Sequence, residues 1–165
     1  MKLTPRIEHL PTKLVVGMHR RMSIEKNEIH LLWQAFMPRK KEIINSKNSF
    51  LFSLEVYDDL SFFYQFDPKN EFEKWAAMEV ENFDDVPLQM EKLLIPEGLY
   101  AIFVFKGLTS DAYIFYNLIF AEWLPASGFE LELRPHFALM GEKYKKEDPN
   151  SEEEIFIPIK VRDTN

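Results

Sequence analysis

The feature of this sequence that most restricts its fold is an internal duplication. In the first half, LPTKLVVGMHRRMS leads into IEKNEIHLLWQAFMP, and in the second half, IPEGLYAIFVFKGLTS leads into DAYIFYNLIFAEWLP. Each copy opens with an apolar residue and a proline, continues as a β-rich run and then adopts a helical pattern that reaches another proline. The same small architecture is therefore expected twice in one chain.

The two predicted helices carry apolar stripes of identical spacing. Apolar residues at i, i+3, i+4 and i+7 share one face of a helix. The stripe of the first helix consists of Ile29, Leu32, Trp33 and Phe36, and that of the second consists of Tyr116, Ile119, Phe120 and Trp123. Matching faces, entries and exits indicate a duplicated unit, with each helix expected to end at its proline, Pro38 or Pro125.

Further strands are predicted after each helix. Residues 50–57 alternate between apolar and mixed positions, which is typical of a strand with two different faces. Residues 75–83 and 153–161 alternate similarly, and 129–133 form a shorter run. We therefore expect an α+β fold made of duplicated β-α-β-β units with pseudo-twofold symmetry. It would contain an antiparallel sheet, two main helices and a groove between the repeats, which is a natural ligand site.

The length of 165 residues predicts a single domain. We expect repeat one at about residues 3–83, a linker at about 84–90 and repeat two at about 91–162. Because the repeats account for residues 1–165, no DNA-binding domain is expected within them.

Composition excludes several kinds of function. A net charge of -7 argues against direct nucleic-acid binding, and five glycines provide no phosphate-binding loop. Cysteine is absent, and the four histidines lack metal-ligand spacing, so neither a metal nor a cofactor is expected. No apolar run approaches the ~18 residues of a membrane span, and the first residues lack a signal-peptide pattern. The expected location is the cytoplasm, without membrane contact.

Carboxylates within apolar strand patterns are the first candidates for a binding site. Glu55, Glu79 and Glu154 occupy such positions. They are ordinary solvent-facing residues if their face is exposed, and partly desolvated anions if it lines the groove. For Glu154 the groove is favoured, because Phe156 shares its face.

Two aromatic residues are further candidates. Trp123 stands at the end of its helical stripe, where a ring can reach the rim of a pocket, although such stripes more often form core. Tyr57 lies on the strand face opposite Phe50, Phe52 and Leu54, and its ring can both stack and hydrogen bond.

Three segments resemble a known family: LLIPEGLYAIFVFKG, AEWLPASGFELELRPHF and DPNSEEEIFIPIK. They are similar to the gyrase-inhibitor-like (GyrI-like) small-molecule-binding domain, which is also the effector-binding domain of AraC- and MerR-type transcription activators. The resemblance is strong over residues 88–161 and weaker over 3–83. It implies one effector-binding domain of two β-α-β-β units, with an aromatic-lined groove for small, often amphipathic or cationic molecules. Some relatives hydrolyse strained cyclopropyl compounds with a buried glutamate.

The resemblance also suggests a set of site residues. The family usually carries Pro-x-Phe-Glu where this chain has Pro135-His136-Phe137-Ala138, so Ala138 stands where a central pocket glutamate is expected. Without that charge, we expect a ligand that is less cationic and more apolar. The predicted ligand-binding set is Tyr57, Glu79, Trp123, Ala138, Met140, Glu154 and Phe156. Glu154 and Glu79 are the weak candidates for a catalytic role.

The leading functional hypothesis is a stand-alone small-molecule (effector) binding protein that senses or sequesters a hydrophobic or aromatic compound. A link to transcription regulation is part of this hypothesis. One alternative is a hydrolase of small reactive, cyclopropyl-type compounds, with Glu154 or Glu79 replacing the missing acid. Another is a protein-binding module whose acidic surface contacts a regulator or DNA gyrase.

Overall fold

A computed structural model describes residues 3–163 of the chain. Its first half contains the strands β1 (Arg6–Leu10), β2 (Lys13–Ser23), β3 (Leu51–Val56) and β4 (Glu71–Glu79), with helices α1 (Ile29–Phe36), η1 (Met37–Glu42) and α2 (Ser61–Tyr64). Its second half contains β5 (Glu91–Ile95), β6 (Gly98–Lys106), β7 (Phe129–Leu131), β8 (His136–Met140) and β9 (Glu152–Val161). The helices of this half are η2 (Thr109–Asp111), α3 (Ala112–Leu118), η3 (Ile119–Trp123) and α4 (Leu124–Ala126).

The strands form one curved antiparallel sheet in the order β1-β6-β9-β8-β3-β4-β2-β5, and β7 pairs with β9 beside this path. The order is symmetric, since β2-β4-β3 from the first half is mirrored by β6-β9-β8 from the second. The two halves meet where β3 pairs with β8, with Ser53 directly opposite Ala138. The predicted α+β fold with two similar units is therefore confirmed.

The first strand of each half pairs with the other half, which the sequence pattern did not predict. β1 pairs with β6, with Arg6 opposite Ile102, and β5 pairs with β2, with Ile95 opposite Lys13. Leu10-Pro11 and Ile95-Pro96 connect these strands to β2 and β6. As a result, β1 and β5 form the two ends of the strand order.

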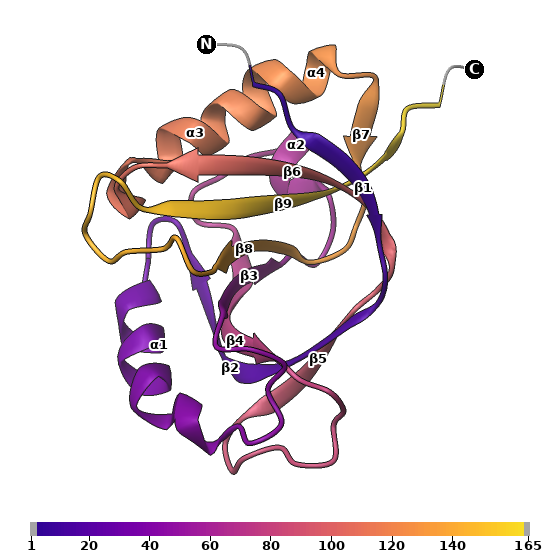
Figure 1. The fold of residues 1–165 in the computed structure, drawn as a ribbon. Coiled ribbons are helices and arrows are strands. Elements are labelled where there is room, and N and C mark those ends of the chain that lie inside the picture. The colour runs from indigo at the N-terminus through magenta and orange to yellow at the C-terminus, as the bar shows by residue number, and fades with distance from the viewer. Residues whose placement is uncertain (1–2, 164–165) are drawn as a thin grey trace.

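Both long helices lie on the same, outer side of the sheet (Figure 1). Leu32 and Phe36 of α1 are buried against Val16 of β2 and Ala76 of β4, and Ile119 is buried against Ile155 of β9. The expected helix ends at Pro38 and Pro125 are wrong, because the chain continues into η1 and α4. Each proline lies in the first turn of the following segment, where its missing N–H costs no hydrogen bond.

No helix of residues 3–163 is long and apolar enough to cross a membrane.

Candidate functional site

The pleat of the central strands divides the predicted site residues between two faces. We call the side covered by α1 and α3 the helix face and the opposite side the inner face. The predicted residues on the helix face are Tyr57, Ala138 and Met140 of the sheet and Trp123 of η3. Those on the inner face are Glu79, Glu154 and Phe156. The predicted set is thus split, with four residues on the helix face and three on the inner face.

On the helix face, ionisable and aromatic side chains gather over the centre of the sheet. We call them the helix-face cluster: Glu55, Tyr57, Lys74, Tyr116, His136 and Glu153. Strand pairing explains most of this grouping, because Glu55 is directly opposite both Lys74 and His136. The Lys74 ammonium lies 3.1 Å from the Glu55 carboxylate, and both side chains are mostly buried, at 9% and 17% exposure.

Glu153 is the carboxylate of the cluster that lacks a counter-charge within bonding distance. Its residue is only 9% exposed, and within residues 3–163 it forms neither an ion pair nor a side-chain hydrogen bond. Burial raises the pKa of its carboxyl, the charge of Lys74 lowers it in part, and the charge of Glu55 raises it further. A buried anion without a partner is costly, so the site favours a positive charge beside it.

Two tyrosines bring hydroxyl groups to these carboxylates. Burial raises the pKa of Tyr116 well above its usual value, and the charges of Glu55 and Glu153 raise it further. The pKa of Tyr57 is also raised well above its usual value, mainly by burial and to a smaller extent by the charge of Glu55. Both hydroxyls therefore stay protonated at neutral pH. Neither forms a hydrogen bond to another described residue, which leaves both free for a ligand.

His136 contributes a neutral ring to the same region. It is 5% exposed, and burial lowers its pKa to about 3, with a smaller contribution from the charge of Arg134. Its ring stacks on Phe63 at 5.2 Å between centroids and meets the edge of Tyr57 at 5.0 Å. The ring is a wall of the cluster and carries no charge at neutral pH.

The segment that contains α2 covers the aromatic end of the cluster. The rings of Phe62 and Phe63 lie 4.5 and 4.8 Å from that of Tyr57. Tyr64 and Phe66 of the same segment are 68% and 58% exposed. Helix α2 has only four residues, so few backbone hydrogen bonds resist its displacement. The cover over this end of the cluster is therefore a short segment with little secondary structure of its own.

The inner face contains a separate cavity of about 270 Å³. Its lining includes Glu79 and Phe156 of the predicted set. Glu154 lies on the same face, where its carboxylate is 2.8 Å from the Arg6 guanidinium. Sequence alternation correctly predicted that Glu154 and Phe156 share a face.

Four members of the helix-face cluster were missed as candidates by sequence reasoning. Tyr116 was assigned to the apolar stripe of its helix, and His136 to ordinary surface or core positions. Glu153 stands within a run of three glutamates that reads as solvated, and Lys74 precedes the apolar run of β4. Only the spacing of two residues between Glu153 and the buried Ile155 indicated that Glu153 lies on a buried face.

Metal chemistry has no visible basis in the described part of the chain, where no group of three or more His, Asp or Glu side chains is placed to hold an ion. The cluster instead combines aromatic rings, two protonated hydroxyls and a buried acid. Such a set can bind an aromatic cation, and its acid can also donate a proton.

Comparison with known proteins identifies the class. Residues 3–160 match the family described as GyrI-like small molecule binding domain, and the chain belongs to this family. Its duplicated sheet is thus that of a small-molecule binding domain.

Individual relatives extend this result. The transcriptional regulator BrlR of Pseudomonas aeruginosa is 29% identical over 155 residues, which cover 93% of this chain and 54% of BrlR. The chain thus spans about half the length of this regulator. The structure of SAV2435 bound to tetraphenylphosphonium is similar in fold, with a TM-score of 0.68, 15% identity and coverage of 96% of this chain and 94% of that one. The EcmrR C-terminal domain has a TM-score of 0.64 at 16% identity, with 98% and 100% coverage.

Proposed function

We propose that this protein binds a hydrophobic aromatic cation in the helix-face cluster, with Glu153 as the counter-charge. The observation that carries the proposal is a buried Glu153 carboxylate with no ion pair or hydrogen bond among the described residues. Glu55 is already neutralised by Lys74 at 3.1 Å, so the cluster retains about one negative charge when Glu153 is ionised. A bound cation removes the cost of that charge.

The proposal replaces the expectation of a less cationic ligand. Ala138 pairs with Ile155, and Glu153 is the next residue along β9 on the same face. The acid that is absent at position 138 is therefore present on the neighbouring strand, two residues along. A cation between the two helices can reach it without a carboxylate at the centre of the sheet.

Two similarities support the proposed ligand class and role. SAV2435, which has the same fold, is bound to tetraphenylphosphonium, a large aromatic cation. BrlR is a transcriptional regulator, and this chain matches about half of it. We propose that cation binding serves either sequestration of the compound or sensing that is passed on to transcription.

The direct test is calorimetric titration of the protein with tetraphenylphosphonium. Glu153→Gln keeps the size of the side chain and removes its charge, and should weaken binding roughly 10- to 100-fold, since a contact to a charged group contributes about 1.5–3 kcal/mol. Glu154→Gln is the matched control, because residue 154 faces the opposite side of the same strand. Neutral triphenylphosphine oxide should bind the parent protein and Glu153→Gln alike. Equal losses for both variants, or none for Glu153→Gln, would refute the assignment.

A second candidate is hydrolysis of a small reactive compound. It is favoured by the raised pKa of Glu153, because a carboxyl group that holds its proton more firmly than usual is better suited to act as a general acid. Turnover of a strained cyclopropyl ester should then be abolished in Glu153→Gln and retained in Glu154→Gln. Absence of product at high protein concentration would remove this candidate and leave the binding proposal intact.

A further inference from the structure

The inner face of the sheet contains a cavity that shares no lining residue with the helix-face cluster. Its cavity of about 270 Å³ lies near the low end of volumes for ligand pockets. Strands of both halves line it, since Phe52 belongs to β3, Glu79 to β4, Ile102 to β6 and Phe137 to β8. The cavity therefore exists only in the assembled pair of repeats.

Stacked aromatic rings form its floor. Phe137 stacks on Phe156 with 4.3 Å between centroids and 13° between planes, and on Phe52 with 5.4 Å and 26°. Leu139 and Ile102 complete the apolar lining. Such a surface favours a flat aromatic group, which gains both area burial and ring contacts.

Two lysines lie around one carboxylate at Glu79; Lys13 and Glu79 line the cavity, and Lys47 contacts Glu79 without being among the lining residues. The ammonium groups of Lys13 and Lys47 lie 3.7 and 3.9 Å from the same carboxylate oxygen of Glu79. Both distances exceed that of a hydrogen bond, so neither lysine has its donors satisfied by Glu79. The other rim cation, Arg6, is already bound to Glu8 and Glu154 at 3.1 and 2.8 Å. The unsatisfied donors thus lie at the lysine end, where two cations share one anion.

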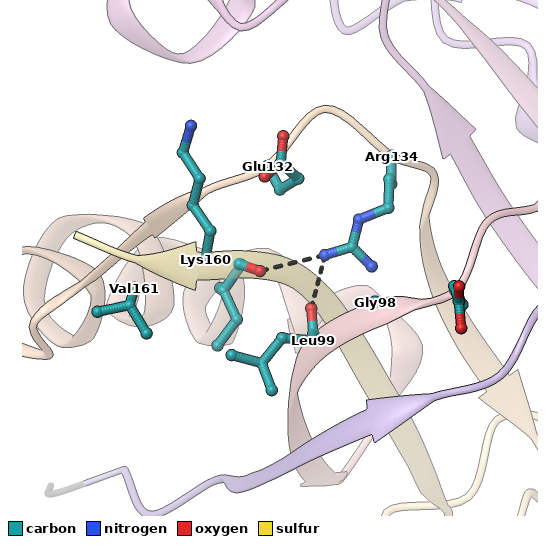
Figure 2. Close-up of a pocket in the computed structure, with 8 residues that line it drawn as sticks. Gly98, Leu99, Glu132, Arg134, Lys160 and Val161 are labelled. Carbon is teal, nitrogen blue, oxygen red and sulfur yellow. Dashed lines mark hydrogen bonds between the residues drawn. The ribbon is translucent and has the colours of Figure 1, made fainter. Parts of the chain in front are cut away.

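Arg134 lines a different pocket of about 480 Å³, together with Gly98, Leu99 and Ile159 (Figure 2). Arg134 lies 4.7 Å from the centre of the Tyr100 ring and donates hydrogen bonds to the carbonyls of Leu99 and Ile159 at 2.8 and 3.1 Å (Figure 2).

We propose that the inner-face cavity binds an aromatic carboxylate. Its ring system lies on the Phe137–Phe156 stack, and its carboxylate lies between Lys13 and Lys47. This second site is independent of the helix-face cluster, which favours the opposite charge, so the two faces of one sheet select ligands of opposite sign.

The test compares three ligands of one shape: 1-naphthaleneacetate, 2-(1-naphthyl)ethylamine and 1-naphthaleneethanol. Binding to the full chain is measured by calorimetry, and the site is located by NMR shift changes. Naphthaleneacetate should bind most tightly. Lys13→Gln should weaken it at least fivefold while leaving naphthaleneethanol unchanged, and Leu139→Trp, which fills the cavity, should abolish both. Lys160→Gln is the control and should change neither, because Lys160 lines the separate pocket beside Arg134.

Several results would overturn the proposal. One is that naphthaleneacetate shows no saturable binding to the folded protein. The others are that the amine binds as tightly as naphthaleneacetate or more tightly, or that Lys13→Gln leaves the affinity for naphthaleneacetate unchanged. Glu153→Gln separates this site from the proposed function, because it should leave naphthaleneacetate binding intact while it weakens tetraphenylphosphonium binding. If Leu139→Trp fails to fold, Lys13→Gln alone still decides, since its side chain lies on the rim.

Discussion

Ser53 and Ala138 face each other in the register of β3 and β8, at the junction of the two repeats. The centre of the helix face is therefore occupied by two small side chains. Ionisable groups lie on the same face nearby. Glu55 is two residues after Ser53 on β3, and Glu153 is two residues before Ile155, the partner of Ala138 on β9. In the proposed site the acid lies on β9, whereas the family resemblance led us to expect one at position 138 on β8.

Ala138→Glu should place a third carboxylate in this region. Because residue 138 is 6% exposed and no cation is free there, the variant should lose about 1–3 kcal/mol of unfolding free energy at pH 8. Part of that loss should return at pH 5, where the new carboxyl is protonated. Urea denaturation at both pH values measures it, with Ala138→Gln as the uncharged control. A variant equally stable at both values would show that the new side chain reaches solvent.

His136 should make the protein sensitive to mild acid. Its folded pKa of about 3 lies below the ordinary value of 6.5, so between these values the unfolded chain binds a proton that the native state does not. The unfolding free energy should therefore fall as pH drops from about 6.5, by at most ~1.4 kcal/mol per pH unit. The raised pKa of Glu153 has the opposite effect on stability. As the pH falls, the native state binds this proton at a higher pH than the unfolded chain does, which increases the unfolding free energy.

Comparing His136→Phe with the parent protein between pH 6.5 and 5 isolates the contribution of the histidine, because Glu153 is present in both proteins. His136→Phe, which retains an aromatic ring beside Phe63, should flatten the decline there, as measured by urea denaturation. His9→Gln, at an exposed position, should retain the slope of the parent protein. An unchanged slope in His136→Phe would mean that other groups cause the acid sensitivity.

Gly17 should be intolerant of any side chain. A Cβ atom at this position would lie 2.0 Å from the backbone oxygen of Ala76 and 2.6 Å from the Cα of Ala77, so β2 and β4 would have to separate. Gly17→Ala should cost at least about 2 kcal/mol of unfolding free energy. Gly141→Ala is the matched control, because its Cβ would meet only Phe50 at 3.8 Å. Similar stabilities of the two variants would contradict the close approach of β2 and β4.

Gly98 and Arg134 should be energetically coupled. A Cβ at residue 98 would lie 2.0 Å from Nη1 of Arg134, a buried atom without a hydrogen-bond partner among residues 3–163. Gly98→Ala should therefore displace the guanidinium from Tyr100 and from its two carbonyl acceptors. In Arg134→Ala the same glycine substitution should cost much less. A double-mutant cycle of unfolding free energies measures this coupling, and additive effects would indicate that the two residues do not compete for space.

Sequence periodicity predicted much of the fold and less of the site. The alternation of 50–57 and of 153–161 correctly separated Phe52 and Leu54 from Glu55, and Ile155 from Phe156, because a pleated strand must alternate. It could not show which strands are neighbours. Tyr57 and Glu154 therefore entered one predicted site, although the sheet separates them. The exchange of β1 and β5 and the meeting of Lys74, Glu55 and Glu153 depend on long-range register, which local patterns do not encode.

The most direct test of the central claim is the pKa of the Glu153 carboxyl, followed by carboxyl-carbon NMR in the free protein and in the protein saturated with tetraphenylphosphonium. In the free protein burial should hold this pKa above its ordinary value of 4.5, and the bound cation should lower it because it stabilises the carboxylate. Glu154 should show no such response. A Glu153 pKa that is the same with and without the cation would contradict the account, because the cation would then bind away from this acid.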